Sequence, residues 1–254
     1  MSSVAEKPNW FSRLANPGQF LIWSRLVNRP LAVVTGLVFV AGLYYALLHS
    51  PADYQMGETV RIMYIHVPNA WLSQFVYGVM VVSALGSLVW RHPMADVSMK
   101  AAAPLGAVFT GLALYTGSLW GRPTWGTFWE WDGRMTSTLV LFFIYLGLIA
   151  LWRAFDDQLR AGRIVAVFTL IGAINIPIVK FSVDWWHTLH QPASVFTPEG
   201  PHMPMSILMP LLIMTLAFTL LFTSLQLLSM QVEVRRRRLA TMEKRRAYAA
   251  GTPN

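Results

Sequence analysis

The sequence predicts an all-α integral membrane protein, folded as a bundle of six transmembrane helices. Hydrophobic residues make up 55% of the 254 residues and charged residues only 13%, about half the charged share of a soluble domain. Six stretches are nearly free of charge and long enough to cross a hydrocarbon core of about 30 Å. The Lys and Arg residues lie between these stretches rather than along one basic face. A soluble fold and a nucleic-acid partner are therefore disfavoured, and membrane lipid is the expected surrounding.

The six apolar stretches occupy, in chain order, residues 31–49, 69–90, 101–121, 135–152, 164–179 and 203–232. The fifth stretch is the shortest and contains Asn175 and Pro177. Because proline lacks a backbone N–H, we expect a kinked helix whose freed backbone groups find partners inside the bundle. Arg163 and Lys180 flank it and can extend their charged ends to the membrane surface.

The distribution of Lys and Arg predicts the orientation of the bundle. Sixteen of these residues fall on the side that holds both chain ends, and four fall on the other side. Positively charged segments stay preferentially in the cytoplasm. Both termini are therefore predicted to be cytoplasmic, and the three segments on the other side to face outward.

The chain divides into a membrane domain and two flanking segments. Residues 1–30 form a cytoplasmic segment in which residues 19–28 are expected to lie on the inner surface as an amphipathic helix. This segment is too charged and too rich in proline for a cleaved signal peptide, so the first apolar stretch is expected to be retained. Residues 31–232 form the six-helix domain, and residues 233–254 form a basic cytoplasmic tail that anchors the topology.

Several kinds of chemistry have no support in the sequence. There is no cysteine, which excludes a disulfide framework, a thiolate metal site and a Cys nucleophile. No glycine-rich phosphate loop and no nucleophile elbow is present. Asp156 and Asp157 lie in a predicted cytoplasmic loop among arginines, where ion pairing or solvation accounts for them. The sequence therefore predicts no catalytic residues.

The outer segments at residues 50–68, 120–134 and 180–202 carry the unusual residues. The middle segment contains four Trp and one Phe within fifteen residues, beside Asp132 and Arg134. An aromatic belt at the membrane surface needs only one or two such residues per helix end. The density favours a platform for a flat, apolar ligand with polar edges, and the belt remains the alternative.

Histidines occur in the two segments on either side of this aromatic loop. His66 precedes the second apolar stretch, and His187 and His190 follow the fifth. One imidazole from each segment could occupy the two axial positions of a haem iron, and haem propionates could bind Arg61, Arg122 or Arg134. His187 and His190 could instead share a zinc ion, but no third ligand is evident. His49 and His202 are expected to be interfacial, and His92 lies on the cytoplasmic side.

The aromatic and histidine motifs together resemble a known family. Residues 125–137, Trp-Gly-Thr-Phe-Trp-Glu-Trp-Asp-Gly-Arg-Met-Thr-Ser, resemble the tryptophan-rich WWD signature of the haem-handling proteins of cytochrome c maturation. With the histidine motif at 64–68, the Trp pair at 185–186 and Thr-Leu-His-Gln at 188–191, the chain is similar to the CcmC family over nearly all of its length after about residue 25. Phe128 and Glu130 depart from the family's usual residues at their positions.

The resemblance implies a haem-delivery protein rather than an enzyme. Haem b would be held at the periplasmic face of the bacterial inner membrane, with His66 and His190 as the axial iron ligands. The haem would then pass to a periplasmic haem chaperone of the CcmE type. Implied partners are also CcmA- and CcmB-like subunits of an ABC transporter and a CcmD-like small single-span protein. The other implied haem-contacting residues are Trp120, Trp125, Trp129, Trp131, Asp132 and Arg134.

Two other functions stay open from the residues alone. The six helices could form a transporter for haem or a small solute, although they contain almost no charged residues to line a path. The aromatic loop could instead be a docking surface of a purely structural subunit, which would bind no haem.

Overall fold

The computed structural model describes residues 15–192, 194–195 and 197–251 of the chain. This part is helical apart from turns and one isolated bridge between Asp53 and Gly57. Six helical stretches are long and apolar enough to cross a membrane, so the prediction of an all-α six-helix bundle is confirmed. The elements are α2 (Pro17–Tyr44), η1 (Tyr45–His49), η2 (Glu58–Ile62), α3 (Met63–Trp90), α4 (Pro93–Trp125), α5 (Gly133–Ala154), α6 (Gln158–Gly172), α7 (Asn175–Trp185) and α8 (Met205–Ala249).

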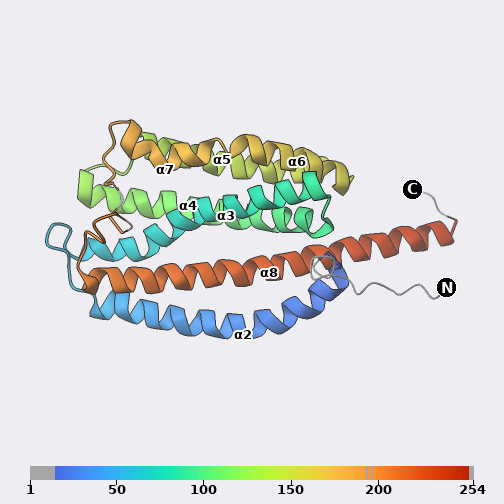
Figure 1. Ribbon diagram of the computed structural model, residues 1–254, viewed down its shortest axis with the longest axis horizontal. Coiled ribbons are helices and arrows are strands. Elements are labelled where there is room, and N and C mark those ends of the chain that lie inside the picture. The colour runs from blue at the N-terminus through green and yellow to red at the C-terminus, as the bar shows by residue number, and fades with distance from the viewer. Residues whose placement is uncertain (1–14, 193, 196, 252–254) are drawn as a thin grey trace.

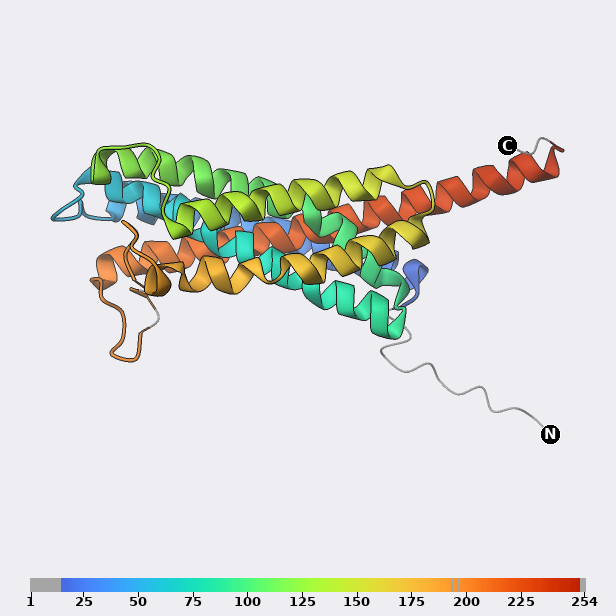
Figure 2. The same ribbon diagram turned by 90° about the horizontal axis from the view of Figure 1, so that it is seen from above.

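The helices form one elongated bundle with its connections gathered at its two ends (Figure 1). The start of α2 and the end of α8 lie at one end, and the three predicted outer segments lie at the other. This arrangement agrees with an even number of spans, while the assignment of one end to the cytoplasm stays a prediction. Helix α8 has 45 residues, or about 68 Å at 1.5 Å per residue, and its basic end projects beyond the bundle (Figure 2).

The helices extend beyond several of the predicted apolar stretches. Residues 19–28 are helical, as expected, and continue through Pro30 into the first span without a break; their position on the membrane surface stays a prediction. His66 lies in the first turn of α3 rather than before it. Helix α4 continues to Trp125 and ends at Gly126, which adopts a left-handed φ of 81°. The connection between the third and fourth spans is therefore only residues 126–132.

The fifth span is broken, as the proline predicted, and the break precedes Pro177. Helix α6 ends at Gly172 and α7 begins at Asn175. The Asn175 side chain donates a 2.9 Å hydrogen bond to the carbonyl of Ser137 in α5. The backbone N–H groups of Ala173, Ile174 and Ile176 at the break bond to nearby carbonyls of the same segment, which satisfies these groups at membrane depth.

The main core lies among α3, α4, α5, α6 and α8. Buried tyrosines connect these helices as well as filling space: Tyr77 of α3 donates to the carbonyl of Thr169 at 3.0 Å, and Tyr145 of α5 donates to the carbonyl of Ser73 at 2.8 Å. A hydroxyl buried in apolar surroundings needs such a partner. A second cluster, at the end with the outer segments, packs η1, η2 and α3 against α8 and includes Trp120 at its edge. This cluster fixes the helix ends that carry the site.

Candidate histidine site

His190 is held by the aspartate that ends the aromatic loop. Its Nδ1 lies 2.8 Å from Oδ2 of Asp132, and its backbone N–H donates to Thr188 Oγ1 at 3.1 Å. The Thr188 hydroxyl also donates to the same Asp132 oxygen. A carboxylate can only accept, so the ring proton of His190 lies on Nδ1 and the lone pair on Nε2. Asp132 therefore fixes both the orientation and the tautomer of His190.

Asp132 has a second task, because it is also the N-cap of α5. Its Oδ1 accepts the backbone N–H of Met135 at 2.7 Å, as Asp commonly does at a helix start. Burial would raise the pKa of Asp132, but the bonds from Thr188, Met135 and His190 outweigh it and hold the pKa below its ordinary value. Burial lowers the pKa of His190, and Asp132 only partly opposes this. A carboxylate and a neutral imidazole are thus the favoured pair near neutral pH.

His66 is oriented in a comparable way from the opposite side. Its Nδ1 lies 3.1 Å from the carbonyl of Ala113 and 3.2 Å from Thr116 Oγ1, both on α4. A carbonyl can only accept, so Nδ1 again carries the proton and Nε2 the lone pair. Each histidine thus shows the arrangement typical of metal-ligating imidazoles, in which the second nitrogen donates to an oxygen of the protein.

The two imidazoles belong to one site. Both rings lie against the end of α4, His66 beside Trp120 and His190 beside Trp125. Neither Nε2 has a hydrogen bond within the described residues. The structure therefore brings together two histidines that are far apart in the sequence. The Nε2 lone pair of each ring is available to a metal ion.

Two tryptophans pack against the two histidines. The Trp120 and His66 ring centroids are 5.7 Å apart, and those of Trp125 and His190 are 4.8 Å apart; both pairs meet edge to face. Trp120 and Trp125 are partly buried at the end of α4. They therefore fix the imidazole rings from the side as well as adding aromatic surface.

The remaining tryptophans of the loop divide into a covered one and an exposed one. Trp129 is partly buried and meets Trp131 edge to face at 5.4 Å, while Trp131 is 72% exposed. The indole N–H groups of Trp120 and Trp129 are buried without a hydrogen-bond partner in the described residues. Unpartnered buried donors are uncommon, and they suit a polar-edged ligand at this site.

The arginines at this end differ in how far the structure already uses their guanidinium groups. Arg61 bonds to Glu58 at 2.6 Å and to carbonyls at the end of η1, so it closes that helix end. Arg122 bonds to the Gly126 carbonyl and lies over the Phe128 ring. Arg134 bonds to the Lys180 carbonyl at 3.2 Å, beside the Asp132 carboxylate. Arg134 is therefore the arginine best placed for a negative group near both histidines.

The other histidines do not join this pair. His187 is exposed, and His202 bonds within its own loop to Thr197. No group of three or more potential metal ligands of the His, Cys, Asp or Glu type occurs among the described residues. The zinc alternative therefore has no third ligand in the part of the chain that is described.

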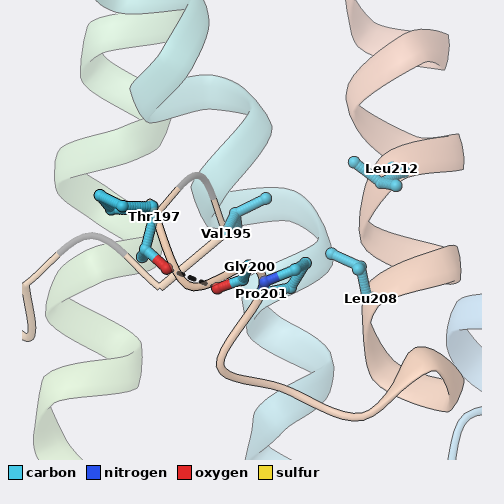
Figure 3. A pocket seen from close by; sticks show the side chains of 7 residues that line it. Val195, Thr197, Gly200, Pro201, Leu208 and Leu212 are labelled. Atoms are coloured by element: carbon cyan, nitrogen blue, oxygen red, sulfur yellow. Dashed lines mark hydrogen bonds between the residues drawn. The ribbon is translucent and has the colours of Figure 1, made fainter.

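A hollow at the same end of the bundle is distinct from the histidine pair. It measures about 570 Å³ and lies between α8 and the loop that follows α7 (Figure 3). Its described lining is mainly apolar, with Val195, Pro201, Leu208 and Leu212 beside the Thr197 hydroxyl, and it carries no titratable group.

Sequence reasoning did not assign roles to Thr188, Ala113 or Gly117, which support the two histidines. Thr188 could have been found, because it stands two residues before His190 and a Thr at that spacing often bonds to the following backbone. Ala113 contributes only its carbonyl, and Gly117 contributes only its lack of a side chain. The sequence carries no signal for those two roles.

Gly117 leaves room for the His66 ring, and Gly117→Ala is expected to displace that ring. An added Cβ would lie 2.9 Å from His66 Cε1, closer than real contacts allow. We expect weaker ligand binding at the His66 side, measured by titration, with unchanged or slightly raised thermal stability, since alanine favours the helix by about 1 kcal/mol. Gly111→Ala is the matched control, because its Cβ would lie at an ordinary 3.4 Å from Phe142 in the same helix. Equal binding by both variants would contradict the packing role of Gly117.

Comparison with known proteins places this arrangement in a family. The family model described as CcmC, heme exporter protein C, matches residues 10–245. Among curated relatives, the heme exporter protein C of Bradyrhizobium diazoefficiens is 61% identical over 91% of this chain and 87% of its own length. Those of Escherichia coli K12 and Paracoccus denitrificans are 43% and 39% identical, over 92% and 90% of this chain and 89% and 95% of their own lengths. With two oriented histidines, a tryptophan-rich connection and six membrane spans, the chain belongs to the CcmC family, the heme exporter protein C family.

Proposed function

We propose that this protein binds haem b between His66 and His190 and delivers it to a periplasmic haem chaperone. Family membership implies a role in haem handling during cytochrome c maturation. The observation that carries the proposal is the pair of imidazoles whose Nδ1 atoms are engaged by Asp132 and Ala113. Each Nε2 is thereby left as a donor for one axial position of an iron.

The surroundings of the histidine pair fit a haem. The macrocycle is flat and apolar with two carboxylates at one edge, and the bound iron offers two axial positions. Trp120 and Trp125 pack beside the two histidines, and the unpartnered indole N–H groups of Trp120 and Trp129 could donate to polar edges of the ligand. Arg134 supplies a cation for a propionate.

Delivery requires exchange of ligands on the iron and no change in the bonds of the macrocycle. His66 and His190 hold the iron through Nε2, and each bond must break as an incoming chaperone offers its own donor. The exposed Trp131 and Phe128, 72% and 55% exposed, give such a partner an aromatic surface beside the site. No bond is hydrolysed and no group is transferred by this chain, so we propose a delivery protein rather than an enzyme.

The family also implies a multicomponent maturation system. We propose that the chaperone is CcmE-like, that CcmA- and CcmB-like subunits of an ABC transporter release it once loaded, and that a CcmD-like single-span protein completes the assembly. The chain is a multi-pass membrane protein. We place it in the bacterial inner membrane with the histidine pair at the periplasmic face, because the pair lies at the end opposite the basic end of α8 (Figure 1) and positive segments stay inside.

Transport through the bundle is the less favoured function. Some buried polar side chains of the spans bond between helices: the Asn175 amide donates to the Ser137 carbonyl, and the Gln226 amide donates to Ser98. A transport path needs polar groups that remain available to the solute.

The visible absorption spectrum of the purified protein, as isolated and after addition of haem, tests the proposal. Two histidine ligands produce a six-coordinate iron, so we expect sharp α and β bands after reduction. A protein that stays without a haem spectrum after haem is added would contradict the proposal and favour the docking-subunit alternative.

A further inference from the structure

The opposite end of the bundle contains a second cavity, remote from the histidine pair. It measures about 480 Å³ and lies where α4, α5, α6 and α8 meet at the end that holds the start of α2. Its lining combines apolar residues with cationic, acidic and neutral polar ones: Lys100, Pro104, Ile149, Trp152, Arg153, Phe155, Asp156, Gln158 and Arg236. Nothing in the haem function uses these residues.

Positive charge dominates the cavity. Arg153 and Arg236 are exposed and form no ion pair within the described residues. Lys100 donates to Gln158 at 2.6 Å and to Glu233 at 2.9 Å, which leaves one of its three N–H donors. Asp156 is the one acidic residue in the described lining. Glu233 balances the charge of Lys100, which leaves the cations of Arg153 and Arg236 facing the single carboxylate of Asp156. The lining therefore keeps a positive excess that favours an anion.

Trp152 provides a second, independent sign of a ligand. It is 4% exposed and lines the cavity, yet its buried indole N–H has no hydrogen-bond partner in the described part of the chain. The ammonium of Lys100 lies 5.4 Å from the ring centroid, so the tryptophan also helps to hold that cation. A buried donor without a partner is costly unless a ligand or water accepts from it.

The shape and position of the cavity indicate a lipid. Pro104, Ile149, Trp152 and Phe155 form an apolar wall, while the cations lie where the helices end. Helix α5 stops at Ala154 and α6 starts at Gln158, so the site coincides with the level of lipid headgroups. A free phosphate ion would gain nothing from the apolar wall, whereas a phospholipid would place its acyl chains along it.

We propose that this cavity is a binding site for an anionic phospholipid, with the headgroup phosphate held by Lys100, Arg153 and Arg236. The indole N–H of Trp152 donates to the same headgroup. The lipid joins α5, α6 and α8 at this end, where Lys100 of α4 contacts Gln158 of α6 and Glu233 of α8. The site is independent of haem binding.

Native mass spectrometry of the full-length protein, titrated with phosphatidylglycerol, tests this proposal. The test variant is Arg153→Gln/Arg236→Gln, and the control is Arg245→Gln/Arg246→Gln, which removes the same charge from α8 beyond the cavity. Each Arg near a membrane surface adds about 1 kcal/mol to anionic lipid binding, so we expect the tightest lipid to bind at least tenfold more weakly in the test variant. The control should change by less than threefold.

Three further arms separate the possible sources of the anion. Trp152→Phe keeps an aromatic side chain and removes the N–H donor, and should weaken the binding of phosphatidylglycerol without lowering the haem content. Phosphatidylcholine should bind to the wild type and to the test variant alike, as weakly as phosphatidylglycerol binds to the test variant. Inorganic phosphate should neither displace the lipid nor raise the melting temperature. Equal losses in the test and control variants, or full replacement of the lipid by inorganic phosphate, would overturn the proposal.

Discussion

Replacement of both His66 and His190 by alanine is expected to abolish the six-coordinate haem spectrum. In the proposed site each imidazole would supply one axial bond through an Nε2 that has no other partner among the described residues, so the double variant would have no iron ligand left there. Each single variant should keep one ligand and give a broadened, high-spin spectrum with weaker binding. The aromatic contacts alone are expected to retain only loosely bound haem.

The control for this experiment is His187→Ala. His187 lies close to His190 in the sequence but is exposed and contacts neither Asp132 nor the aromatic rings by any bond in the described structure. Its spectrum should equal that of the wild type. A double variant that retains sharp α and β bands, or a His187 variant that loses them, would show that the axial ligands lie elsewhere.

Asp132→Asn is expected to weaken haem binding about 10- to 100-fold, the usual range for a residue that orients a metal ligand, with little loss of stability. Asparagine caps helices as well as aspartate, so its side-chain oxygen can still accept from Met135. Its amide group would then face His190 Nδ1 as a donor. The ring proton would be driven to Nε2, the atom that the iron needs.

Asp132→Ala should lose both roles at once. We expect the same loss of binding and a destabilisation of about 1 kcal/mol from the missing N-cap. Asp157→Ala is the matched control, because Asp157 caps α6 by accepting from Leu159 at 2.9 Å on the opposite end of the bundle. It should lose stability but keep the haem spectrum. Binding by Asp132→Asn at the wild-type level would show that the carboxylate is not needed for the tautomer of His190.

Much of the architecture follows from local features of the sequence. A span is recognisable because an apolar stretch of about 20 residues is itself the requirement for crossing a bilayer. The break in the fifth span was likewise predictable, since Pro177 cannot donate a backbone hydrogen bond. Its position before Asn175, where that side chain bonds to the Ser137 carbonyl of a neighbouring helix, was not predicted.

The candidate site was predictable in its residue types but not in its internal bonds. Trp-rich sequence and histidines on both sides indicated a flat ligand. In the structure His190 bonds to Asp132, and His66 and His190 each pack against a tryptophan at the end of α4. The predicted loop at 120–134 is shorter, since α4 continues to Trp125. Of the three arginines considered for a propionate, Arg61 is taken up by the end of η1. Hydropathy and residue spacing contain no information about where α4 ends or about which groups Arg61 bonds to.

The sequence by itself thus determined the membrane-spanning fold, the residue types of the site and the charge asymmetry, because each depends on the local order of apolar and charged residues. Only the tertiary structure decided which nitrogen of each histidine is free. It also assembled the cavity proposed to bind lipid, where Lys100 meets Glu233 from 133 positions away. These features depend on which helices pack together. The residues of one helix do not by themselves specify which other helices it contacts.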